Sequence, residues 1–244
     1  MKKHVRTVCA VVATGLMLAA NACGTQLIVN GGFEAGTLEG WTQLRMHGGN
    51  TGGFFADNDA VTPVTGHTTV GAARGSYYAV ADQSGPGATV LLQTFSVEAG
   101  DTAILSFALF VNNHNATAAI NPAGLVWNAA PNQHVRVDIL RAGSDPFSTA
   151  AADVLGNFYL GADTGGNPHN YTAYSFDVTS IVAAGGTFQL RFAEVSNQSY
   201  LTLGIDEVSI IADRIAVPEP PTIALVSCGL LLAAGRWIAR RSRQ

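Results

Sequence analysis

The sequence predicts an all-β protein, an antiparallel β-sandwich of the jelly-roll type. Three observations support this fold class: several segments alternate apolar and polar residues with a period of two, turns rich in Gly and Asn separate them, and no long stretch carries apolar residues at helical spacing. We expect an N-terminal signal peptide before the sandwich and a short hydrophobic helix after it.

The first 22 residues are typical of a secretory signal peptide. Three basic residues within the first six precede an apolar stretch, 8–20, and the small residues Ala20 and Ala22 frame a cleavage site. Cys23 follows directly, so lipidation of Cys23 is the alternative. A lipoprotein site normally has a larger aliphatic residue where Ala20 stands, which favours simple cleavage.

The central part, 23–212, is predicted to form the sandwich. The segments with the clearest strand pattern are 76–81, 89–97, 103–111, 134–141, 171–178, 187–195 and 201–211. The turn at 98–101 predicts a hairpin between the second and third of these. Two stretches depart from the pattern: 112–132 is a long polar loop, and the Ala-rich stretch 148–159 favours one or two helical turns.

The chain ends with a Pro-rich linker, 213–221, and a hydrophobic segment within 222–244. The uncharged run 223–235 would form a helix of roughly 20 Å, shorter than a hydrocarbon core of about 30 Å, and it spans a membrane only with help from the residues that follow. Four arginines close the chain, which by the positive-inside rule places the sandwich outside the cytoplasm.

The order of Pro218, Glu219 and Pro220, a short apolar helix and a terminal Arg cluster resembles the sorting tail of PEP-CTERM proteins of bacterial surfaces. The resemblance implies export, membrane attachment through the C-terminal helix, and recognition of the three residues by an exosortase-type processing enzyme. It further implies removal of the tail and delivery to the cell envelope or an extracellular matrix such as a biofilm. A plain tail anchor after a Pro-rich stalk is the alternative.

Composition narrows the function of the exported part. Between Cys23 and Val217 stand six arginines and no lysine against sixteen carboxylates, a formal charge of -10, so the chain has no basic patch and nucleic acid is not expected as a partner. Of the three cysteines, Cys9 lies in the signal peptide and Cys228 in the hydrophobic tail. The sandwich therefore forms no internal disulfide.

Both ends of the sandwich carry a second resemblance. Residues 27–34, followed by Gly40 and Trp41, are similar to the opening of galactose-binding-like jelly-roll modules, which include many carbohydrate-binding modules, and residues 204–210 are similar to their closing strand. The resemblance implies that the two segments lie side by side. It also implies a structural calcium ion where they meet.

Glu34 and Asp206 stand at the positions that this resemblance assigns to calcium ligands. Ca²⁺ takes six to eight hard oxygen atoms, and carbonyl groups of Asn30 and Gly31 could supply further ligands. In the alternative interpretation, Glu34 caps a turn and Asp206 binds an arginine or backbone N–H groups.

Aromatic residues are the other candidates for a site. Trp127, in its polar loop, is the candidate for stacking on a sugar ring of a polysaccharide, with packing of the loop onto the sandwich as the equal alternative. Trp41, Phe95, Phe107 and Phe192 are predicted to belong to the core.

No motif of a common nucleophile, zinc or phosphate site occurs in the exported part, and no catalytic residue is predicted. The sequence thus predicts a non-enzymatic surface or matrix protein that binds glycans. A secreted, glycan-active hydrolase without a recognisable motif and a purely structural surface protein are the alternatives.

Overall fold

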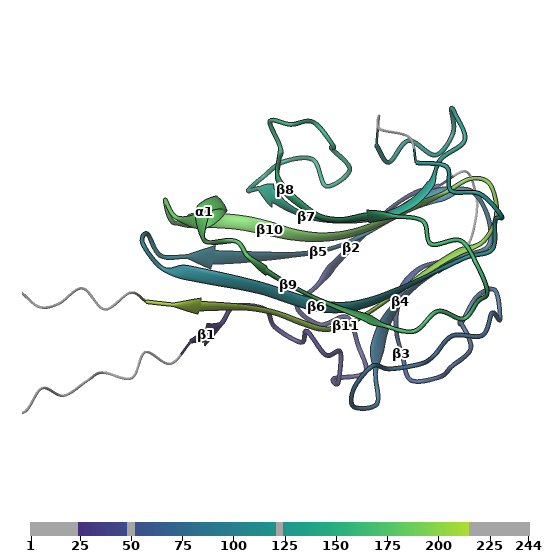
Figure 1. Cartoon of the computed structure of the whole chain (residues 1–244), viewed down its shortest axis with the longest axis horizontal. Helices are drawn as coiled ribbons and strands as arrows, with labels where there is room; N and C mark the ends of the chain where they lie inside the picture. Colours follow the sequence, from purple (N-terminus) through teal and green to yellow (C-terminus); the bar gives the residue numbers. More distant parts are fainter. Residues whose placement is uncertain (1–23, 48–51, 121–123, 215–244) are drawn as a thin grey trace, which may run out of the picture. The chain divides into compact units, whose positions relative to one another are not determined.

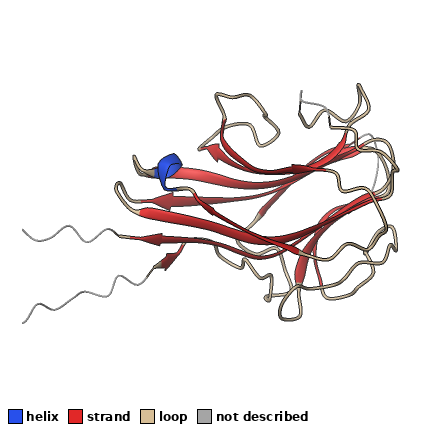
Figure 2. Ribbon diagram, in the orientation of Figure 1, coloured by secondary structure: helices blue, strands red, loops and turns tan. Residues whose placement is uncertain are grey.

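Two antiparallel β-sheets pack face to face and confirm the predicted sandwich (Figures 1 and 2). The computed structural model describes residues 24–47, 52–120 and 124–214, which belong to one compact unit, Gly24–Ile215. The predicted signal peptide, the Pro218-Glu219-Pro220 motif and the C-terminal helix lie outside the described residues. Within the described ranges, no helix is long and apolar enough to cross a membrane.

Sheet A has the strand order β3-β4-β11-β6-β9, with β1 paired to the end of β11, and sheet B has the order β2-β5-β10-β7-β8. The strands of sheet A are β1 (Thr25–Gln26), β3 (Gly52–Asp57), β4 (Tyr78–Gln83), β6 (Thr102–Asn113), β9 (Thr172–Asp177) and β11 (Leu201–Asp213). Those of sheet B are β2 (Thr42–His47), β5 (Gly87–Val97), β7 (Gln133–Arg141), β8 (Val154–Gly161) and β10 (Gly186–Ser196). One turn of helix, α1 (Thr179–Val182), precedes β10.

The first and last segments lie side by side, as predicted. Thr25 pairs with Ala212, the Leu27 N–H donates to the Ile210 carbonyl at 2.8 Å, and the Val208 N–H donates to the Gly31 carbonyl at 3.0 Å. Both ends of the described chain therefore meet along β11.

The predicted hairpin between β5 and β6 is wrong. The turn exists, with a hydrogen bond of 3.2 Å from Asp101 N–H to the Glu98 carbonyl and with Gly100 at φ 85°. However, β5 pairs with β2 and β10 in sheet B, whereas β6 pairs with β9 and β11 in sheet A. Alternation reveals which face of a strand is buried, not which strand is its neighbour, so the turn crosses between layers.

No helix forms in 148–159. A single hydrogen-bonded turn, from Val154 N–H to the Ala150 carbonyl at 3.0 Å, precedes Val154–Gly161, which is edge strand β8 paired with β7. Its register shifts twice, and Phe158 is the extra residue between the pairs Val137–Tyr159 and Asp138–Asn157. Such bulges twist an edge strand so that it does not pair with a further strand. They also interrupt the period-two alternation of apolar and polar residues from which a strand is predicted.

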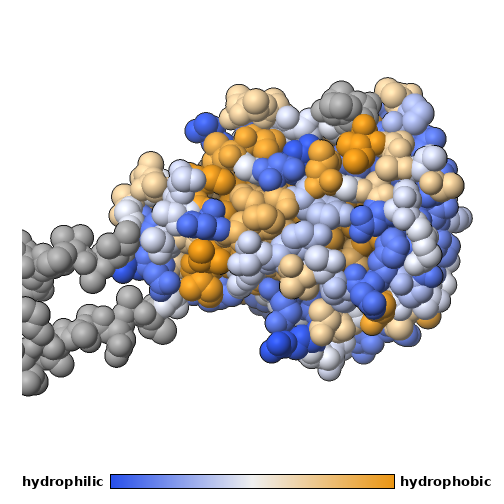
Figure 3. All heavy atoms as spheres, in the orientation of Figure 1, coloured by the Kyte–Doolittle hydropathy of each residue, from blue (hydrophilic) through white to orange (hydrophobic). Residues whose placement is uncertain are grey.

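Alternate residues of both sheets fill the core, in which Phe107 of sheet A meets Phe192 of sheet B edge to face at 5.6 Å. The four aromatic residues predicted as core are each at most 8% exposed, which confirms that prediction. Half-buried aromatic residues of β8 and β9 pack against the same core, and Figure 3 shows apolar side chains gathered where these two edge strands face the viewer.

Candidate functional site: a groove on the outer face of sheet A

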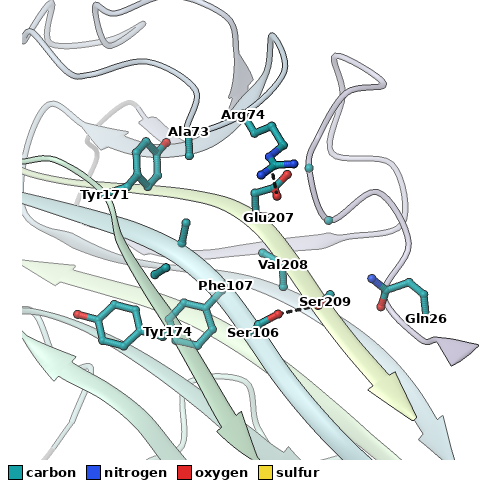
Figure 4. Close-up of a pocket in the computed structure, with 14 residues that line it drawn as sticks. Gln26, Ala73, Arg74, Ser106, Phe107, Tyr171, Tyr174, Glu207, Val208 and Ser209 are labelled. Carbon is teal, nitrogen blue, oxygen red and sulfur yellow. Dashed lines mark hydrogen bonds and ion pairs between the residues drawn. The ribbon is translucent and has the colours of Figure 1, made fainter. Parts of the chain in front are cut away.

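The outer face of sheet A is hollowed by an open groove of about 610 Å³ (Figure 4). Elsewhere on this face, Tyr78, Val80 and Phe110 are covered by residues of the loop that links β3 to β4 and by Tyr171. The groove is the part of the face that this loop leaves open.

Small side chains form the floor of the groove. Ser106 and Ala108 lie two residues apart on β6, Ala173 lies opposite Ala108 on β9, and Ser209 lies opposite Ser106 on β11. Successive residues of a strand point to opposite faces, so these residues share the outer face while their neighbours fill the core. Ser106 Oγ and Ser209 Oγ lie 2.7 Å apart and share a hydrogen bond. Because these four side chains are small, they leave the space above the sheet unfilled.

A bulge in β11 brings a carboxylate to the rim. The register with β6 shifts between Asp206 and Ser209, and Glu207 adopts a left-handed backbone with φ 53°. Its carboxylate pairs with Arg74 Nε at 3.2 Å, and the two side chains are 44% and 80% exposed (Figure 4). An exposed pair of this kind contributes little to stability, so both groups can exchange their partner for a ligand at small cost.

Two carboxylates hold the loop that carries Arg74. Asp206 Oδ2 accepts the N–H groups of Ala73 and Arg74, while Glu34 accepts those of Ser76 and Tyr77. Asp206 is fully buried. Burial raises the pKa of its carboxyl, and the backbone N–H bonds oppose part of that rise.

The N-terminal segment lines the groove through Gly31 and Gly32, which lie beside β11. A side chain at Gly31 would overlap with the Val208 carbonyl. The neighbouring residues Asn30 and Phe33 have φ of 52° and 57°, and with Glu207 they are the non-glycine residues of positive φ in the described ranges. Of these three residues, Glu207 lines the groove, and strained conformations of this kind gather at functional sites.

Tyr171 lines the groove beside Ala73 (Figure 4). Its ring meets Phe110 edge to face at 5.0 Å, and its hydroxyl donates to the Gly71 carbonyl at 2.9 Å. Burial raises the pKa of this phenol, followed in effect by the charge of Asp206, so the hydroxyl stays protonated. These contacts fix the position of Tyr171, which forms one side of the groove.

The structure brings the predicted calcium ligands into one neighbourhood. A Cβ atom on Gly32 would lie 3.8 Å from Glu34 Cγ and 3.9 Å from Asp206 Oδ1. Yet the proposed ligand groups already accept hydrogen bonds: both carboxylates from backbone N–H groups, Asn30 O from Phe33 and Trp41, and Gly31 O from Val208. Glu34 Oε2 and Asp206 Oδ1 accept one bond each and retain a lone pair.

The described residues hold no cluster of three or more His, Cys, Asp or Glu side chains able to bind a metal. The observed contacts are those of the alternative interpretation, in which both residues bind backbone. Calcium at this site stays a prediction.

Trp127 lies away from the groove, in the loop over the outer face of sheet B. It is half-buried and packs against the apolar cluster that contains Val90, Leu92 and Leu125. The loop is fixed by Asn197, whose Nδ2 donates to the Trp127 carbonyl at 2.7 Å. The structure thus shows Trp127 in packing contacts, and a role in binding stays a prediction.

Sequence reasoning missed the groove residues Arg74, Tyr171 and Glu207. The one available sign is the Asp-Glu pair at 206–207 inside a largely apolar closing strand, and the calcium hypothesis uses only the first of these two carboxylates.

No known protein-family profile matches the chain, and no curated protein sequence matches it significantly. Among solved structures it is similar to the carbohydrate-binding module TmCBM61 in complex with β-1,4-galactotriose, at 12% identity and TM-score 0.46 over 76% of this chain and 98% of that one. It is also similar to the K3 adhesin domain of Lys-gingipain from Porphyromonas gingivalis, at 16% identity and TM-score 0.47 over 77% and 99%. A third is a Stig cyclase from Fischerella sp. TAU, at 14% identity and TM-score 0.45 over 79% and 99%.

These three are a binding module, an adhesin domain and an enzyme. Such distant likenesses do not transfer a ligand or an activity, because one fold serves many functions.

Proposed function

We propose that this chain is an exported, non-catalytic glycan-binding protein, and that the groove on sheet A binds a linear glycan. The carrying observation is the groove itself, an open trough of about 610 Å³ with a floor of small residues and a rim of hydrogen-bonding groups. Its volume and its open side leave room for a ligand longer than one sugar ring.

The rim matches sugar hydroxyl groups. Arg74 supplies donors, Glu207 supplies acceptors, and Ser106 and Ser209 supply both. In the part of the chain that the structure describes, Arg74 is the cationic residue that lines the groove, and it is paired with Glu207. An anionic ligand such as a phosphate chain therefore meets no net positive charge from these residues. Neutral, polyhydroxylated ligands fit best.

The groove favours binding over hydrolysis. Glycoside hydrolysis needs two carboxyl groups on either side of the scissile bond. Among the described residues that line the groove, Glu207 is the acidic one, while Asp206 behind it is buried and bound to backbone N–H groups. The same described lining includes no histidine or cysteine that could act as a base or nucleophile.

Blocking the groove tests the proposal. Ala173 is exposed on edge strand β9, so Ala173→Trp fills the floor without disturbing the core. We expect it to weaken binding on a glycan array by about tenfold or more, a loss of about 1.4 kcal/mol. Thr94→Trp, at an exposed position of sheet B, is the control and should bind like wild type. If Ala173→Trp and Thr94→Trp bind glycans equally well, the groove is not the glycan-binding site.

We further propose that Pro218, Glu219 and Pro220 direct processing by an exosortase-type enzyme, after which the protein resides in the envelope or matrix. The support is the sequence pattern at 218–244. Mass spectrometry of the protein from its native host tests it, and we expect no peptide C-terminal to about Pro220. Recovery of Arg240 to Gln244 from the surface form would favour a tail anchor.

A further inference from the structure

A second, smaller pocket of about 190 Å³ lies at the end of the sandwich where β5 and β11 begin. Two loops line it, 84–86 between β4 and β5 and 197–200 between β10 and β11, together with Gln83 and Ser196. None of these residues belongs to the groove on sheet A. The two sites are therefore separate.

Buried amides fix one wall of this pocket before any ligand arrives. Gln133 is fully buried, and its Oε1 accepts the N–H groups of Gln198 at 3.0 Å and Ser199 at 2.8 Å. Its Nε2 donates to Asn113 Oδ1 at 2.6 Å, so the glutamine cannot turn away. Ser196 Oγ donates to the Ser199 carbonyl at 2.6 Å and closes the same turn. A preorganised loop loses little entropy on binding.

Tyr200 presents an aromatic ring beside the pocket. The residue is 44% exposed, and the centroid of its ring lies 4.8 Å from that of His67. The ring centroids of His67 and His114 are 4.1 Å apart. This column of three rings sets the orientation of the tyrosine while leaving part of it open to a ligand.

Among the described residues that line this pocket, none carries a charged side chain. Its side chains are amides, hydroxyls and one phenol, with Gly85 and Pro86 completing the wall. Such a lining offers hydrogen bonds and a ring to stack on, without attraction for either sign of charge. Its volume of about 190 Å³ is about a third of the groove's 610 Å³, which suits one small ring and not an extended chain.

We propose that this pocket is a second binding site, which takes a single neutral sugar ring such as the terminal residue of a glycan, with Tyr200 as its stacking surface. The proposal shares the ligand class of the proposed function but does not need the groove. A protein with both sites could hold the end of one chain and the middle of another.

Backbone NMR of the exported protein with free D-galactose, D-glucose and N-acetyl-D-glucosamine as probes tests the site. We expect at least one sugar to shift the amide resonances of 84–85 and 197–200 while leaving those of Ala173 and Ser209 unchanged. Tyr200→Ala should raise the Kd about tenfold, equivalent to about 1.4 kcal/mol. Tyr200→Phe keeps the ring and should bind within about twofold of wild type, a difference of about 0.4 kcal/mol.

The outcomes separate the two sites. Shifts confined to the groove, or no shift with any of the three sugars, would overturn the second site. Loss of binding in Tyr200→Phe as well would overturn the stacking role. The variant Ala173→Trp should leave these shifts intact, so failure of the groove and failure of the pocket are read independently.

Discussion

Glu34 and Asp206 bind neighbouring stretches of one loop. Asp206 Oδ2 accepts N–H groups from Ala73 and Arg74 at 2.9 and 3.0 Å, and Glu34 Oε1 accepts those from Ser76 and Tyr77, both at 2.9 Å. The opening segment and the closing strand thereby fix the loop that carries Arg74 to the rim of the groove. Both residues are positioning groups for the proposed glycan site.

The calcium hypothesis for Glu34 and Asp206 predicts a higher melting temperature in millimolar calcium than in excess EDTA. At a hundredfold excess over Kd the ligand adds about 2.7 kcal/mol, or roughly 5 to 10 °C for a domain of this size. The difference should vanish in Asp206→Ala. Coincident wild-type melts would contradict calcium binding and leave both carboxylates with backbone anchoring alone.

Gly31→Ala should destabilise the protein by about 2 kcal/mol or more, because the new methyl group overlaps with the Val208 carbonyl in backbone that cannot yield cheaply. The Tm should fall by about 4 °C or more. Gly166→Ala is the matched control, since nothing lies within 4 Å of a Cβ atom there and its backbone is not left-handed. Thermal denaturation of both variants decides, and equal melting temperatures would contradict the close approach of Gly31 to β11.

Glu194 should make the protein less stable as the pH rises. Its side chain is fully buried, and burial raises the pKa of its carboxyl well above the ordinary value, with the charge of Asp82 acting in the same direction. The native state therefore keeps a proton that the unfolded chain loses above about pH 4.3, and stability falls above that pH.

Glu194→Gln should then raise the Tm by a few degrees, on the order of 1 kcal/mol or more, at neutral pH. The substitution keeps an acceptor for Gln83 Nε2, which lies 3.3 Å from Glu194 Oε1. The gain should shrink towards zero near pH 4, where both states of the wild type are protonated. A lower Tm at neutral pH would mean that the carboxylate is ionised and paired.

His134 should act in the opposite sense. Burial lowers the pKa of its imidazole to about 4, helped by the charge of Arg136 and opposed by that of Asp138. The native state stays neutral while the unfolded chain binds a proton below about pH 6.5, so stability is lost as the pH falls from about 6.5 to 4. The loss is on the order of 3 kcal/mol.

Urea denaturation of the wild type and His134→Gln over this range measures the effect. Between pH 6.5 and 4 the free energy of unfolding should fall less steeply in the variant than in the wild type. The difference in slope corresponds to uptake of up to about one proton, or about 1.4 kcal/mol per pH unit. If the free energy of unfolding falls with pH equally steeply in both proteins, other groups cause the acid sensitivity.

Alternation in the sequence was sufficient to predict seven of the eleven strands that the described residues form, because burial of one face is a local pattern with period two. It failed for β8, whose bulge at Phe158 breaks the period. It also failed for β2 and β3, short strands at the sheet edges with Gly52, Gly53 and charged residues in place of alternating apolar ones. The pairing of the first and last segments followed from a resemblance and not from alternation.

The sequence by itself determined the class of fold and the core aromatics, since each depends on composition or on neighbours in the chain. Its targeting segments stay predictions. Only the tertiary structure decided where a ligand could bind. The groove exists because four small residues from three strands share the part of a sheet face that a distant loop leaves uncovered. The charges of its rim come from Arg74 and Glu207, which are 133 positions apart in the numbering and meet only because Asp206 and Glu34 hold the loop in place. Such a juxtaposition depends on strand order and loop path, for which local sequence periodicity carries no information.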